Sequence, residues 1–111
     1  MPDYTNHIMK NWDWCAEYRF RLGKEAFYKY VDNVYTLLSE MKSESFFSIE
    51  KNVKPENRDL FIKCCCMFMQ EQFMSEVSRE FCHGFNRECT EVRCMKLYYS
   101  KNNNKINTET P

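Results

Sequence analysis

The side chains best suited to chemistry are cysteine and histidine residues between positions 82 and 94. Cys82, His83, Cys89 and Cys94 are all possible zinc ligands. Tetrahedral zinc holds its ligand atoms within about 4 Å of one another, whereas residues 82 and 89 of one continuous helix would lie about 10.5 Å apart along its axis. A site would need a turn at Gly84, and the paired Cys-x-x-Cys spacing is missing. We therefore interpret these cysteines as buried free thiols and expect no metal and no cofactor.

The other nucleophiles and carboxylates show no catalytic pattern. The triplet Cys64–Cys66 would point in three directions on a helix, so packing is its expected role. His83 follows Cys82 but lies about 100° around a helix from it, so the thiol has no evident base. A single Glu80-x-x-His83 is half of a di-iron motif, which needs two such pairs. We expect a protein that is not an enzyme.

A second pattern, in residues 75–99, has the outline of a helix-turn-helix, with the turn at Gly84. The second helix would present basic side chains and a threonine, and the tail would add a positive charge. The candidate nucleic-acid-binding residues are Arg87, Thr90, Arg93, Lys96 and Lys101. Glu88 and Glu91 would face the phosphates, and the chain carries 16 basic against 16 acidic side chains. A nucleic-acid-binding regulator is therefore the alternative function, and an ordinary helical hairpin with a solvated polar face explains the same residues.

The aromatic content favours a protein partner. The chain has 9 Phe, 7 Tyr, 7 Met and 7 Cys, so its core must be built from bulky, polarizable groups that can leave an apolar patch exposed. Near the N-terminus, Trp12, Trp14 and Tyr18 are interleaved with charged residues. The preferred function is a non-enzymatic binding protein, a protein-interaction or self-associating module whose partner is another protein or a second copy.

Length and composition narrow the fold. A chain of 111 residues is one domain, and only 2 glycines exclude dinucleotide-binding folds, P-loops and glycine-rich β-sandwiches. Seven cysteines, an odd number with three consecutive, indicate reduced thiols and a cytoplasmic location. No apolar run is long enough to span a membrane, and the first 15 residues lack the apolar block of a secretion signal.

Apolar residues recur at helical spacing along most of the chain. The pattern predicts helices over 12–22 and 24–42, with Gly23 between them, and a short helix within 43–53. A central helix is predicted near 57–82, because Pro55 supplies a start signal and residues 60–69 are apolar almost all round. A final helix is predicted over 87–99, capped by Asn86. The expected fold is an all-α bundle of four to five helices over residues 1–99, with a disordered polar tail over 100–111.

Overall fold

The computed structural model describes the backbone of residues 3–71 and 74–109, and the side chains of these ranges as far as residue 100. This part of the chain contains seven α-helices, two short 3-10 helices and no strand, which confirms the all-α class. The elements are α1 (Thr5–Lys10), α2 (Trp12–Leu22), α3 (Lys24–Ser39), η1 (Ser43–Ser45), α4 (Phe46–Asn52), η2 (Pro55–Asn57), α5 (Arg58–Met69), α6 (Glu76–Phe85) and α7 (Val92–Glu109). None of the helices described is long and apolar enough to cross a bilayer.

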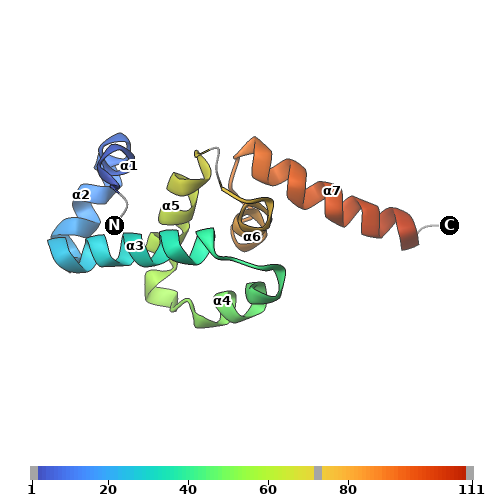
Figure 1. The fold of residues 1–111 in the computed structure, drawn as a ribbon, viewed down its shortest axis with the longest axis horizontal. Coiled ribbons are helices and arrows are strands. Elements are labelled where there is room, and N and C mark those ends of the chain that lie inside the picture. The colour runs from blue at the N-terminus through green and yellow to red at the C-terminus, as the bar shows by residue number, and fades with distance from the viewer. Residues whose placement is uncertain (1–2, 72–73, 110–111) are drawn as a thin grey trace.

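The helices are arranged around α5. Helix α3 packs against both α2 and α5, α5 packs against α6, and α6 packs most extensively against α7. Figure 1 shows α1 and α2 at one end of the molecule and the second half of α7 extending away at the other. This extension gives principal dimensions of 55 × 26 × 24 Å.

Helix α5 is the central helix that the sequence predicts. Seven of its 12 residues are buried, on more than one face, because α3 and α6 cover different sides of it. The Phe68 ring packs edge-on against Tyr35 and Tyr4, with ring centroids 5.2 and 5.8 Å away. The predicted core of aromatic and sulfur-containing side chains is therefore confirmed.

The N-terminal segment is more ordered than its sequence suggests, since no helix was predicted before Trp12. Helix α1 buries Ile8, and Tyr4 just before it is 5% exposed. The Tyr4 hydroxyl donates a hydrogen bond of 2.5 Å to Oδ1 of Asp32 in α3. This non-local bond fastens the segment, and no local pattern reveals it.

The predicted helices over 12–22 and 24–42 are present as α2 and α3. Gly23 separates them with φ of +91°, a conformation that favours glycine because it has no side chain to clash. Helix α3 ends at Ser39, three residues early. The short helix expected within 43–53 is η1 followed by α4.

The predicted central helix near 57–82 and the count of four to five helices are wrong. The chain forms two helices there, α5 ending at Met69 and α6 beginning at Glu76. Ser75 is the N-cap of α6, because its hydroxyl accepts a hydrogen bond of 3.2 Å from the Ser78 backbone N–H. Gln70, Glu71 and Ser75 lie between the two helices.

The last helix also differs from its prediction. Asn86 ends α6, where its backbone N–H donates to the Cys82 carbonyl, and α7 begins only at Val92. Helix α7 continues to Glu109, past the expected end at 99 and through most of the segment assigned to a disordered tail. Because residues 92–109 contain neither glycine nor proline, nothing in the backbone interrupts the helix. Residues 110 and 111 lie outside the described part.

Candidate functional site

The five residues predicted to contact nucleic acid do not lie on one recognition helix. Arg87 and Thr90 precede α7, in its connection to α6, while Arg93 and Lys96 lie in α7. The Arg93 Nη2 donates to the carbonyl oxygens of Met69 and Gln70 at the end of α5, at 3.0 and 3.3 Å. Lys101 has its backbone in α7 and its side chain outside the described atoms.

Arg87 is also engaged within the molecule, because its guanidinium lies 4.6 Å from the centroid of the Tyr98 ring. Two of the predicted contact residues, Arg87 and Arg93, thus hold the α6–α7 connection in place. A helix-turn-helix in residues 75–99 needs its second helix to begin near residue 87. That predicted helix start is wrong, because α7 begins at Val92. Nucleic-acid binding through these residues stays a prediction.

The principal finding is a cluster of thiols, called the thiol cluster below: Cys65, Cys66, Cys82, Cys89 and Cys94. The sulfur atoms of Cys66, Cys82 and Cys89 all lie within 4.8 Å of one another. The Cys66 and Cys89 sulfurs are 3.8 Å apart. Cys82 is at the centre, within hydrogen-bonding reach of the other four. Five of the seven cysteines therefore meet at one place, contributed by α5, α6, α7 and the α6–α7 connection.

Two arginines hold these elements together. Arg79 of α6 is 4% exposed, and its Nη1 and Nε donate to the carbonyls of Met69 at 2.8 Å and Met74 at 3.3 Å, while its Nη2 donates to Glu71. Met69 is the last residue of α5, where a helix leaves its final acceptors without intrahelical partners, and Glu71 and Met74 lie in the connection to α6. Arg93 ties the start of α7 to the same end of α5. These contacts hold α6 and the start of α7, which carry Cys82 and Cys94, against the end of α5.

The thiols in the cluster differ in acidity because of their hydrogen bonds. Hydrogen bonding with the surrounding thiols, together with burial, raises the pKa of Cys82 well above its usual value. The bond from Cys82 lowers the pKa of Cys89 to about 5, although partial burial opposes this. The pKa of Cys94 is also lowered, first by Cys82 and then by the Arg79 guanidinium. The thiols of Cys89 and Cys94 are therefore more acidic than that of Cys82.

His83 adjoins the cluster without joining it. Its ring is 1% exposed and packs against Tyr98 and Tyr99, with centroids 5.3 and 5.2 Å away. Neither ring nitrogen has a hydrogen-bond partner among the described atoms. Of the four residues considered as zinc ligands, Cys82 and Cys89 belong to the set of three close sulfurs, whose third member is Cys66, whereas His83 and Cys94 lie outside that set.

Cys15 and Cys64 lie outside the cluster. Both are fully buried, and Cys64 interacts with Cys15 of α2. Burial raises the pKa of each thiol, that of Cys15 to about 12. The packing role expected for the triplet Cys64–Cys66 therefore suits Cys64, whereas Cys65 and Cys66 face the cluster. No spacing rule could have found Cys66, because it is 23 positions from Cys89.

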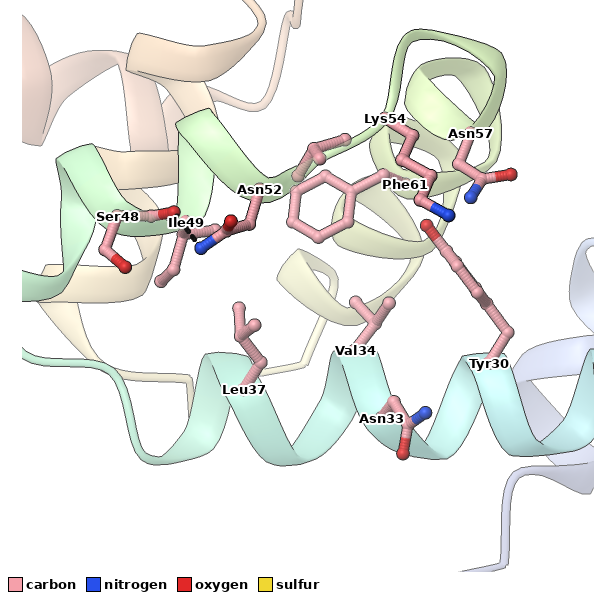
Figure 2. A pocket seen from close by; sticks show the side chains of 11 residues that line it. Tyr30, Asn33, Val34, Leu37, Ser48, Ile49, Asn52, Lys54, Asn57 and Phe61 are labelled. Carbon is pink, nitrogen blue, oxygen red and sulfur yellow. Dashed lines mark hydrogen bonds between the residues drawn. The ribbon is translucent and has the colours of Figure 1, made fainter.

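A second feature is an apolar groove between α3 and α4. Figure 2 shows Val34 and Leu37 rising from α3 into this space, opposite Ile49 of α4 and Phe61 of α5. The cavity has a volume of about 420 Å³. Val34 and Phe61 are buried and form its floor, while Leu37 and Ile49 are half-buried and form its walls.

The groove continues beyond this cavity along α3. A second hollow of about 560 Å³ shares Leu37 and Ile49 with the first and reaches Met41. The two ends carry opposite charges, with Lys54 at the end near Tyr30 and the carboxylates of Glu40 and Glu44 at the other. The groove can therefore hold an elongated apolar ligand whose two ends carry opposite charges.

Comparison with known proteins adds nothing to these two sites, since no family model, no curated protein and no solved structure matches the chain.

Proposed function

We propose that the protein is a non-enzymatic interaction module that binds one amphipathic helix of a partner protein in the α3–α4 groove. The observation that supports this most strongly is the apolar floor and walls of the groove, exposed between two helices. Amphipathic helices bind such grooves through apolar side chains repeated at helical spacing.

The dimensions of the groove favour a helix over a compact small molecule. One wall runs from Tyr30 in α3 to Glu40 just after its end, a rise of ten residue steps and hence about 15 Å. A bound helix of equal length would make about three turns and present three or four apolar anchors.

The end charges favour one orientation of the bound helix. A helix carries partial positive charge at its N-terminus and partial negative charge at its C-terminus. Its N-terminus would lie near Glu40 and Glu44, and its C-terminus near Lys54. A partner that matches this has an apolar stripe and few charges along it.

The lining gives little support for catalysis. The 420 Å³ cavity is lined by aliphatic and aromatic side chains with Ser48, Lys54 and three asparagines, and its described lining holds no carboxylate, imidazole or thiol. The carboxylates of Glu40 and Glu44 lie at the opposite end of the groove from Lys54, so these groups do not form a pair for general acid–base chemistry. Binding without chemistry therefore agrees best with the groove.

A displayed library of 12-residue peptides with variable apolar positions tests the proposal. We expect selection to enrich sequences with apolar residues at i, i+3, i+4 and i+7. Ser48 is exposed and lines both hollows, so Ser48→Arg should fill the groove and weaken the enriched peptides by at least about tenfold. Ser39→Arg makes the same change on α3 outside the groove and should leave affinity within about twofold.

Equal binding to wild type and Ser48→Arg would show that the groove is not the site. A different occupant is tested by sedimentation of the protein alone. If the chain forms a dimer that Ser48→Arg dissociates, the occupant is a second copy and the partner-helix assignment is wrong.

A further inference from the structure

We propose that Cys66, Cys82, Cys89 and Cys94 bind one Zn²⁺ ion that joins α5, α6, the α6–α7 connection and the start of α7. Each of the four residues comes from a different one of these segments. This site is separate from the groove, so either proposal can fail without the other.

The sulfur positions agree with tetrahedral zinc. With Zn–S bonds of about 2.3 Å, two thiolates on one tetrahedral ion lie about 3.8 Å apart. The Cys66 and Cys89 sulfurs are 3.8 Å apart, and Cys82 completes a triangle whose sides are all within 4.8 Å. A disulfide would need the sulfurs at about 2.0 Å, so the spacing is that of metal ligands rather than of a bonded pair.

The fourth ligand is assigned to Cys94. Its thiol is fully buried and interacts with Cys82, and it lies in the first turn of α7, close to Cys89 in the chain. Its sulfur lies outside the set of three that are within 4.8 Å of one another, so it would have to move towards the ion when zinc binds. Cys65 also contacts Cys82. However, neighbouring residues of a helix point about 100° apart, so Cys65 and Cys66 cannot both be directed at one small ion.

The buried charge of Arg79 is an independent reason to place a zinc ion at these cysteines. When four thiols bind Zn²⁺, each S–H gives its proton to solvent, and the four thiolates with one dication carry a net charge of −2. Arg79 is almost fully buried, its other acceptors are neutral carbonyls, and no carboxylate pairs with it in the described part of the chain. A buried cation without an opposite charge is costly. Its guanidinium is near enough to Cys94 to lower the pKa of that thiol, so a zinc site bound there would supply the opposite charge.

The ligand type determines the metal and its role. Sulfur-only sites select soft or borderline metals, and a tetrahedral set of four thiolates is typical of zinc or of iron–sulfur clusters. A cluster of several irons needs more room than the 3.8 Å between Cys66 and Cys89, whereas a single zinc ion does not. Four protein ligands leave no position open for water or substrate, so the ion is structural.

The full chain is tested after reduction and removal of metal with a chelator. Titration with Co²⁺ should produce a sulfur-to-metal charge-transfer band and the visible bands of tetrahedral cobalt, saturating at one ion per chain. Added Zn²⁺ should displace the cobalt and abolish these bands. Zinc should also raise the melting temperature of the reduced protein, because the ion binds only the folded chain.

Single substitutions locate the ligands. Cys89→Ser, in a half-buried connection, is the variant least able to disturb the core. It should weaken zinc binding by more than about 100-fold, beyond the 10–100-fold typical of residues that only support a ligand. Cys64→Ser is the matched control, because it removes one buried thiol from the same turn of α5 as Cys66 but outside the cluster. It should leave affinity and the cobalt spectrum unchanged.

Three results would overturn the proposal. The first is a reduced wild-type protein that binds neither cobalt nor zinc, or that purifies with iron or copper at the cluster. The second is equal loss of affinity in Cys64→Ser and Cys89→Ser, with helix content checked by circular dichroism. The third, directed at the fourth ligand, is full affinity in Cys94→Ser together with loss of binding in Cys65→Ser.

Discussion

Arg79 is the residue whose replacement should most sharply test how the helices are held together. Its guanidinium is buried and donates to the carbonyls of Met69, Glu71 and Met74, which belong to the end of α5 and its connection to α6. Arg79→Met keeps most of the aliphatic volume and removes every donor. The change therefore isolates the hydrogen bonds from the packing.

The expected magnitude follows from those bonds. A hydrogen bond with one charged partner contributes about 1.5–3 kcal/mol, so three such bonds contribute roughly 4–9 kcal/mol before any offset. Burying the guanidinium costs several kcal/mol, which the variant recovers. Some carbonyls also regain water, because Glu71 is only half-buried. We expect a net loss of about 2–4 kcal/mol, which lowers the melting temperature by roughly 8–16 °C in a chain of this length.

Urea unfolding of the reduced protein, followed by circular dichroism with a chelator present, measures this loss without any contribution from metal. The control is Arg21→Met, because Arg21 forms an exposed ion pair with Glu17 one helical turn away and should contribute less than about 0.5 kcal/mol. Arg79→Met within 0.5 kcal/mol of wild type would refute the reasoning. So would full stability in Arg79→Lys, because a lysine cannot present the planar array of donors that these carbonyls use.

Three further changes test other contacts. Gly84→Ala would place a Cβ 3.1 Å from the Tyr98 ring in the α6–α7 interface. The overpacking should cost about 1–3 kcal/mol, more than the roughly 1 kcal/mol gained in helix propensity, so the variant should be less stable. A urea midpoint at or above that of wild type would contradict this. Ser75→Ala removes the N-cap of α6 and should cost about 1 kcal/mol of stability. Ser75→Asp can still cap the helix and should keep most of that stability, and equal urea midpoints for the two variants would argue against the cap. The hydrogen bond to Asp59, with burial, raises the pKa of Tyr18 from 10.0 to about 12. Because the folded-state pKa is the higher one, this contact stabilises the fold below pH 10 and the benefit disappears as pH rises towards 12. Tyr18→Phe should therefore flatten the fall in unfolding free energy over that interval, and an unchanged slope would contradict the assignment.

The helical class and the positions of α2 and α3 could be predicted from the sequence because they depend on local patterns. Apolar residues at steps of three and four define the buried stripe of each helix, and Gly23 marks the break between them. The same reasoning recognised that α5 is covered on more than one face, since its run from residue 60 to 69 is almost wholly apolar.

Helix boundaries after residue 69 depended on contacts that a local pattern does not contain. Arg79 holds the turn between α5 and α6, because it donates both to the Met69 carbonyl at the end of α5 and to the Met74 carbonyl in the connection. Asn86 is a residue type that favours the N-cap position, but here it lies at the end of α6. The groove is likewise a property of the assembled helices, because it exists where α3 and α4 stand apart.

The thiol cluster shows most clearly what the sequence determines by itself and what depends on the tertiary structure. The sequence by itself determined that seven cysteines were present and that those from 82 to 94 had no zinc-finger spacing. Only the tertiary structure decided that Cys66 would meet Cys89, 23 positions away. Burial of the aromatic core packs α6 against α5, and Arg93 then holds the start of α7 against the end of α5. Residues far apart in the chain meet only after those non-local contacts have formed, so spacing along the sequence could not reveal the site.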